Sequence, residues 1–188
     1  MDGNYFLDAR QRFERNKTMK QIQLTQNKVA IVDDEDFEWL NQWKWSAYKS
    51  HNIWYAIRSE LTTNKNRTII RMHREILGLK LGDKLESDHI NHNGLDNRRC
   101  NLRICNRFQN QHNRQPQKNC SSSYKGVYWN KEYRKWQIQI QVNGKRKNLG
   151  RFNSEIEAAR VYDEAARGYY GEFAFTNFKR KGDICLAI

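Results

Sequence analysis

An alternating segment that ends in Asn-Gly constrains the fold of the last third of the chain. From Trp136 to Val142 the sequence reads WQIQIQV, so apolar and Gln side chains alternate strictly. This period places the apolar residues on one face of a strand and the Gln residues on the other. Asn143-Gly144, which follows, is the strongest short signal for a hairpin turn. We therefore predict that strands Lys135–Val142 and Lys145–Phe152 pair antiparallel.

The flanking sequence extends this hairpin into a small α+β module. Pairing across the turn should set Gln141 opposite Arg146, Gln139 opposite Asn148 and Ile138 opposite Leu149. A third strand is expected over Tyr124–Asn130. Ser154, followed three residues later by Glu157, forms a capping box that predicts a helix running to about Gly168.

A polar segment divides this module from the rest of the chain. Lys118–Ser123 is small and polar and follows Pro116, the only proline. We expect one domain over 19–118 and a second over 121–178. Residues 1–18 would form a loosely ordered extension, with Met19 as an alternative start, and 179–188 a C-terminal tail.

The charge of the chain indicates a polyanionic partner. The net charge is +13 and the isoelectric point is near 9.7, and the basic excess is spread along the chain rather than collected in one tail. The four Cys show no zinc-finger spacing, so we expect reduced thiols. No apolar run approaches the roughly 20 residues of a membrane span. We expect a cytoplasmic, DNA-associated protein of a bacterial or phage-infected cell.

A polar run with little to bury contains the candidate chemistry. SDHINHNGLDNRRCNL, residues 87–102, is followed by a segment that predicts a helix over Arg107–Arg114. In the resulting order of strand, loop, strand and helix, Asp88 and Asn110 could face one cation, and such oxygen ligands suit Mg²⁺ or Mn²⁺. His89 could act as the general base for water. This is the composition of a phosphodiester hydrolysis site.

Structural interpretations compete with the functional ones. Asn93, Asp96 and Asn97 could serve only as turn residues. Asp33–Asp36 is better explained by acidic residues at a helix N-terminus than by metal binding. For His73, beside apolar residues, we expect a packed or hydrogen-bonded structural role.

The segment DHINHNGLDNRRCNLRICNRFQNQHNR, within about residues 84–115, resembles the HNH nuclease motif of phage and intron-encoded homing endonucleases. The resemblance implies a ββα-metal fold with Asp88 as the first metal ligand and His89 as the general base. It also implies that Asn101 fixes the loop and orients the base, and that Asn110 is the metal ligand on the helix.

The helix position departs from the variants of the motif that carry His there. His112 and Asn113 lie close by, so these neighbours are the alternatives to Asn110. The implied cofactor is one Mg²⁺ or Mn²⁺ per active site.

Residues 124–178 resemble the AP2 DNA-binding domain. The matching pieces are Tyr124-Lys125-Gly126-Val127, Lys135-Trp136, Leu149-Gly150, Phe152, the Ala-rich helix with Tyr162-Asp163, and Asn177-Phe178. A polar sheet face suits the major groove, where Gln reads adenine and Arg reads guanine. The residues expected to contact DNA are Lys125, Tyr128, Arg134, Gln137, Gln139, Gln141, Arg146 and Asn148.

Together these features predict a site-specific DNA endonuclease of the HNH homing type, acting on double-stranded DNA as a monomer or dimer. The AP2-like module would supply target recognition, so deleting 121–188 should reduce target preference more than the chemistry. The competing class is a non-catalytic DNA-binding regulator. An RNA-binding protein is a weaker third option.

Overall fold

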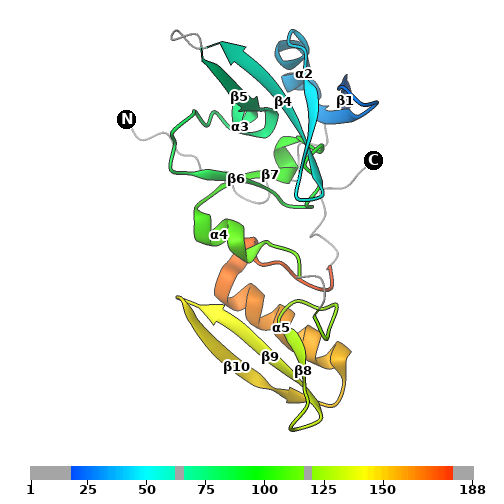
Figure 1. Ribbon diagram of the computed structural model, residues 1–188, viewed down its shortest axis with the longest axis vertical. Coiled ribbons are helices and arrows are strands. Elements are labelled where there is room, and N and C mark those ends of the chain that lie inside the picture. The colour runs from blue at the N-terminus through cyan, green and yellow to red at the C-terminus, as the bar shows by residue number, and fades with distance from the viewer. Residues whose placement is uncertain (1–17, 62–65, 117–119, 180–188) are drawn as a thin grey trace. The chain divides into compact units, whose positions relative to one another are not determined.

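The computed structural model describes residues 18–61, 66–116 and 120–179 (Figure 1). It is a mixed α and β structure with several small antiparallel sheets, compatible with the predicted α+β class. The chain forms two compact units, the first reaching Asn106 and the second beginning at Arg107. This division lies ahead of the domain boundary expected from the sequence, and it assigns the helix after Asn106 to the second unit.

In its described residues the first unit contains three small antiparallel sheets and three short helical segments. Its elements are β1 (Met19–Gln23), β2 (Val29–Asp33), α2 (Asp34–Asn41), β3 (Ser46–Ser50), β4 (Ile53–Leu61), β5 (Arg67–Arg71), α3 (Met72–Ile76), β6 (Glu86–His89), η1 (Arg99–Asn101) and β7 (Leu102–Cys105). The pairings are β1 with β2, β3–β4–β5 in that order, and β6 with β7.

One apolar core joins these pieces. Trp45 is 1% exposed, and its indole Nε1 donates to the Leu40 carbonyl at 2.8 Å, so the polar atom of this buried ring has a partner. The other core residues come from strands, helices and connections alike: Ile22, Leu24, Ala30, Val32, Leu40, Ala47, Ala56, Met72, Ile76 and Leu102. Leu102 brings β7 into this core.

The acidic run Asp33–Asp36 forms the start of α2, as expected. The helix begins at Asp34, with acidic residues throughout its first turn. Asp36 is 2% exposed, and its two carboxylate oxygens each accept a hydrogen bond of 2.7 Å from the Arg99 guanidinium. This bidentate pair connects α2 to the polar segment 87–102.

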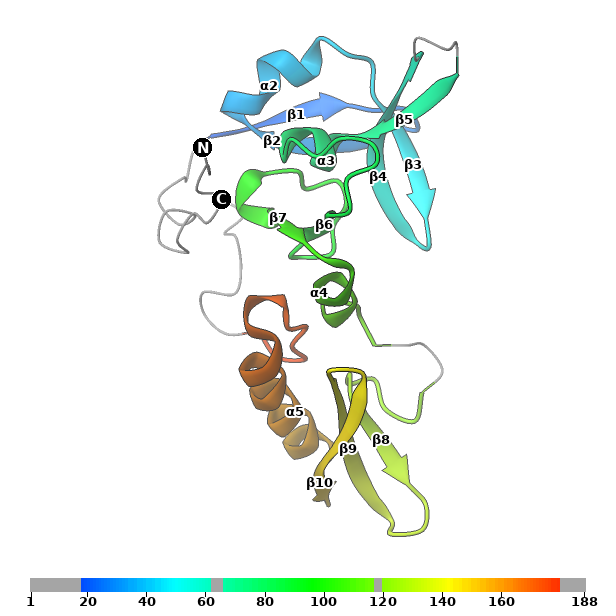
Figure 2. The ribbon, with the colours of Figure 1, turned by 90° about the vertical axis from the view of Figure 1, so that its left-hand side faces the viewer.

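The second unit is a three-stranded sheet packed on one long helix. Its elements are α4 (Arg107–His112), β8 (Val127–Asn130), β9 (Lys135–Val142), β10 (Lys145–Phe152), α5 (Glu155–Tyr170) and η2 (Gly171–Phe173). In both views α5 lies along one face of the sheet, whose order is β10-β9-β8 (Figures 1 and 2). Buried Ala158, Ala159 and Ala166 let α5 pack closely on Ile138 and Ile140.

The expected pattern of this unit is largely confirmed, with one error in the pairing. Gln141 pairs with Arg146 and Gln139 with Asn148. The register then shifts, so Ile138 pairs with Gly150 and not with Leu149. Asn148 Oδ1 accepts from Gly150 N at 3.0 Å, and Gly150 has φ +123°, a conformation available to glycine. Ser154 Oγ accepts from Glu157 N at 3.3 Å, as an N-cap.

Some expectations concern residues that the structure does not describe, and one expectation, about the cysteines, is wrong in part. The proposed extension (1–18) and tail (179–188) lie outside it except for Thr18 and Lys179. Cys100 is disulfide-bonded, whereas Cys105 and Cys120 are free thiols, so the expectation of reduced thiols is wrong for Cys100. No helix in the described part is long and apolar enough to cross a membrane.

Gly126 tests the packing of the second unit. It has φ +78°, and a Cβ there would lie 2.1 Å from the Tyr162 ring and 3.0 Å from the Gln139 carbonyl oxygen. We expect Gly126→Ala to lower the free energy of unfolding by about 2–4 kcal/mol through strain and overpacking. Gly168→Ala, in α5 with nothing near its Cβ, should raise it by roughly 0.5–1 kcal/mol. Thermal and urea unfolding followed by circular dichroism measure both, and equal effects would contradict this packing.

Candidate active site

The β6–β7 hairpin places the two central candidate residues side by side at the end of a strand. Asp88 pairs with Arg103 and His89 with Leu102 in the antiparallel register. Both candidates are largely buried, with Asp88 8% and His89 7% exposed. The strand β6 ends at His89.

Asp88 forms a buried ion pair that the sequence analysis did not identify. Arg103 donates to Asp88 Oδ2 from Nε at 3.0 Å and from a terminal nitrogen at 2.6 Å. Arg103 is only 4% exposed, so the pair is held in a weakly solvated environment where losing one partner is costly. Only the strand register reveals this pair, because a long loop separates the two residues in sequence.

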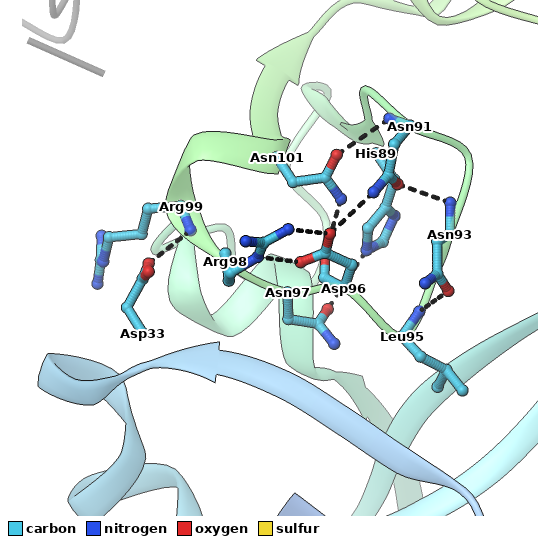
Figure 3. Close-up of polar contacts among 10 residues, drawn as sticks. All are labelled: Asp33, His89, Asn91, Asn93, Leu95, Asp96, Asn97, Arg98, Arg99 and Asn101. Carbon is cyan, nitrogen blue, oxygen red and sulfur yellow. Dashed lines mark hydrogen bonds and ion pairs between the residues drawn. The ribbon is translucent and has the colours of Figure 1, made fainter. Parts of the chain in front are cut away.

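The loop between β6 and η1 is shaped by its own polar side chains (Figure 3). Asn101 is 1% exposed; its Oδ1 accepts from Asn91 N at 3.0 Å, and its Nδ2 donates to the Asp96 carbonyl at 2.7 Å. The Asp96 carboxylate accepts from Arg98 Nε and a terminal nitrogen at 2.8 Å, and from Asn91 Nδ2 at 2.8 Å. Asn93 forms local turns, since its Oδ1 accepts from Leu95 N at 3.1 Å. These bonds supply the order that apolar packing supplies elsewhere.

The loop is also fastened to β2. Ile31 N donates to the Leu95 carbonyl, and Asn97 N donates to the Ile31 carbonyl, each at 2.8 Å. Nearby, Asp33 Oδ2 accepts from Arg99 N at 2.7 Å. The segment that precedes the polar run thus forms the scaffold against which the loop is fixed.

The His89 ring is held by Asn97. His89 Nε2 lies 3.3 Å from Asn97 Oδ1. With the hydrogen on Nε2, this contact is a hydrogen bond to the Asn97 oxygen, and that neutral tautomer carries its lone pair on Nδ1. Burial lowers the pKa of His89, opposed by the Asn97 bond and by Asp88 and Asp96, so the ring is in its basic form at neutral pH.

Two further aromatic side chains contact His89 and were not assigned to the site from sequence. His73 meets it edge to face at 4.7 Å between ring centroids, and Tyr55 lies 6.0 Å away. His73 is 5% exposed, and within the described residues its Nδ1 has no hydrogen-bond partner. The packing agrees with the structural role expected for His73, whose ring contacts the ring of the candidate base.

Asn110 lies on α4, in the second unit, whereas Asp88 lies in the first. Its role as the helix ligand stays a prediction. The two alternative helix ligands lie in other surroundings. The His112 ring stacks on the Tyr170 ring, with 3.8 Å between the centroids, and Asn113 is buried, with 4% of its surface exposed.

The available donors fit Mg²⁺ or Mn²⁺ better than zinc. Among the described residues no group of three or more His, Cys, Asp or Glu is placed to hold a metal ion. One carboxylate and one amide oxygen are hard ligands, and Mg²⁺ commonly binds through one or two protein oxygens, with water and substrate phosphate completing its shell.

The residues expected to contact DNA differ in exposure. Arg134, Gln141, Arg146 and Asn148 are exposed, and Tyr128 and Gln139 are half-buried. Gln137 is 6% exposed and accepts from Asn130 Nδ2 at 2.7 Å, so it is engaged within the sheet. Lys125 Nζ donates to the carbonyls of His112 and Arg114 at 2.6 and 2.7 Å.

Comparison with known proteins finds relatives for both parts. A protein of Acanthamoeba polyphaga mimivirus named uncharacterized HNH endonuclease L560 is 31% identical over 138 residues, which cover 71% of each chain. The AP2/ERF and B3 domain-containing proteins TEM1 and RAV1 of Arabidopsis thaliana are 48% identical over 63 and 59 residues. These matches cover 34% and 31% of this chain but only 17% of each plant protein. No family model and no solved structure matches.

His73 makes stability depend on pH. Its burial, together with the nearby His89, Arg71 and Arg74, lowers its pKa well below the ordinary 6.5. Below that value the unfolded chain binds a proton that the folded chain excludes, so the free energy of unfolding falls as the pH falls. His73→Leu should therefore reduce the stability lost between about pH 7.5 and 5.5 by roughly 1 kcal/mol. Urea unfolding at both pH values measures this, and an unchanged loss in the variant would contradict it.

Proposed function

The chain belongs to the HNH endonuclease family, and we propose that it is a metal-dependent, site-specific DNA endonuclease that hydrolyses phosphodiester bonds with a water activated by His89. The observation that supports this most directly is the end of β6. There a neutral, buried imidazole is oriented by Asn97, next to a carboxylate oriented by Arg103. A proton acceptor and a hard metal ligand on adjacent residues are the two groups that such hydrolysis requires.

In the proposed reaction His89 accepts the proton of the attacking water at Nδ1. The Asn97 bond at Nε2 keeps this tautomer, and the rings of Tyr55 and His73 restrict its rotation. Asn101 acts on His89 indirectly, because it holds the loop that carries Asn97. No nucleophilic side chain is needed, because water is the nucleophile.

Asp88 and Asn110 are the residues that would hold the Mg²⁺ or Mn²⁺ ion. When bound, the ion supplies neutralisation of charge on the scissile phosphate and on the leaving oxygen. The contribution of Arg103 is to orient the Asp88 carboxylate and to compensate its buried charge.

The second unit would recognise double-stranded DNA through the polar face of its sheet. Exposed Arg146 and Gln141 pair across β9 and β10, and these residue types read guanine and adenine in the major groove. The AP2/ERF relatives are named as a transcription repressor and a transcription factor, which supports DNA contact by this unit. A net charge of +13 favours attraction to the phosphate backbone.

A non-catalytic DNA-binding regulator is the competing function, favoured by those relatives' names. Metal-dependent cleavage separates the two. Wild-type protein incubated with a broad pool of plasmid or phage DNA and Mg²⁺ or Mn²⁺ should cleave it, and His89→Ala should slow single-turnover cleavage about 10²- to 10⁴-fold.

His51→Ala is the matched control for His89→Ala, since His51 is exposed in the β3–β4 turn and should leave the rate unchanged. Absence of cleavage by the wild type with either metal would support the regulator. Equal cleavage by wild type and His89→Ala would remove His89 as the base.

Arg146 and Lys147 provide a matched test of the recognition face. Arg146 lies on the polar face, whereas Lys147 lies on the other and places its Nζ over the Tyr169 ring. Arg146→Ala should raise the Kd for a cleaved target about 5- to 100-fold, as loss of a base contact does. Lys147→Ala removes the same charge and should change the Kd about twofold. Filter binding in Ca²⁺ measures both, and equal effects would argue against this face.

A further inference from the structure

The register shift in β10 decides on which face of the sheet Arg151 lies. Side chains that are opposite one another in an antiparallel pair share a face. If the pairing of Asn148 with Gln139 continued without a break, Arg151 would stand opposite Trp136, on the apolar face that packs against α5. The shift after Asn148 sets Arg151 opposite Gln137 instead. The irregularity in β10 thus turns a basic side chain onto the polar face of the sheet.

Two side chains hold the guanidinium group of Arg151. Its central carbon lies 3.6 Å from the centroid of the Tyr133 ring, which is the stacked arrangement that guanidinium groups adopt on aromatic faces. Arg151 Nε also donates to Gln137 Oε1 at 3.4 Å. Arg151 and Tyr133 are both exposed, so this planar group has a defined orientation at the surface of the sheet.

Asn130, the last residue of β8, connects the two partners of Arg151. Its Nδ2 donates to Gln137 Oε1 at 2.7 Å, and its Oδ1 accepts from Tyr133 N at 3.1 Å. Gln137 is only 6% exposed, so its amide is fixed among these neighbours. The turn between β8 and β9 and the strand β9 therefore support the guanidinium group together.

This arrangement leaves the end of the guanidinium group available for a ligand. The bond to Gln137 uses Nε, and no hydrogen bond or ion pair within the described residues uses either terminal nitrogen of Arg151. Two parallel N–H donors of this kind match the O6 and N7 acceptors of guanine in the major groove. A side chain that is already oriented also loses less conformational freedom on binding.

We propose that Arg151 reads a guanine of the target DNA, with Tyr133 and Gln137 as positioning residues. This inference rests on the proposed function, in which the polar face of the sheet contacts the major groove. It gives Gln137, which is too buried to reach a base, a role in recognition. The partners of Arg151 and Arg146 on β9 are Gln137 and Gln141, about 13 Å apart along the strand. Because base pairs are about 3.4 Å apart, the two Arg residues contact different base pairs.

Binding to a target selected from random double-stranded DNA tests the proposal. The Kd is measured by filter binding in Ca²⁺ for the target and for variants of it changed one base pair at a time. Arg151→Ala should raise the Kd for the selected target about 5- to 100-fold and remove the preference for guanine at one position. The position that depends on Arg146 should keep its preference. Arg151→Lys retains the charge without the planar fork, so it should also lose preference at the Arg151 position.

Tyr133 variants test the positioning role. Tyr133→Leu removes the stacked ring and should raise the Kd about 2- to 5-fold, with a weaker preference at the position read by Arg151. Tyr133→Phe retains the ring and should keep the wild-type preference. Adding Tyr133→Leu to Arg151→Ala should cause no further loss of preference at that position, because Tyr133 acts there through Arg151.

Arg160→Ala is the matched control for Arg151→Ala. Arg160 is also exposed and stacks on an aromatic ring, with its central carbon 5.0 Å from the centroid of Phe178. It lies on α5, which covers the other face of the sheet (Figures 1 and 2). The control variant loses the same charge and should change the Kd at most about twofold, with every base preference retained.

The outcomes separate this inference from the proposed function. Selection of no preferred target, or no change in any preference with Arg146→Ala, would overturn recognition by the polar face. A preference lost with Arg146→Ala but none lost with Arg151→Ala would overturn only the role of Arg151. Uniform weakening on all targets with Arg151→Ala would identify a phosphate contact and contradict base reading. Equal loss of preference in Tyr133→Phe and Tyr133→Leu would overturn positioning by the stacked ring.

Discussion

The hydrogen bonds of Asn101 to the loop backbone are the interaction on which the candidate site depends. The loop after His89 has few apolar side chains to bury, so packing cannot select its conformation. Asn101 connects its two ends, accepting from Asn91 N and donating to the Asp96 carbonyl while almost fully buried. In such an environment an unpaired amide is costly, so the network favours one loop conformation strongly over others. That conformation carries Asn97 to the His89 ring.

The rest of the first unit serves as a scaffold for this loop. Backbone bonds between β2 and the loop, and the pairing of Arg99 with Asp36, fix it to the only apolar core of this unit in the described residues. The same unit surrounds His89 with rings and Asp88 with a guanidinium. Burial thus has two consequences: it keeps the imidazole uncharged, and it makes the adjacent Asp88 carboxylate depend on its pairing with Arg103.

Sequence reasoning succeeded where local chemistry decides the structure. The Asn143-Gly144 turn, the alternating β9 and the Ser154 cap each depend on residues a few positions apart, and all three occur as expected. It failed where distant segments meet. The pairing of Arg103 with Asp88, the Asn97 contact with His89 and the Lys125 contacts with α4 depend on a register or a tertiary approach that no local pattern encodes. The shift at Gly150 was missed because alternation alone assumes an unbroken ladder.

The central claim is that His89 removes the proton from the attacking water, and chemical rescue tests it most directly. His89→Gly opens a space of the size of the lost ring, beside Tyr55, His73 and Asn97. Single-turnover cleavage of target DNA by this variant, measured with Mn²⁺ and increasing imidazole, should be very slow in plain buffer and rise at least about tenfold with imidazole. Cleavage at the wild-type rate without imidazole, or no gain with imidazole while Mn²⁺ and DNA still bind, would contradict the account.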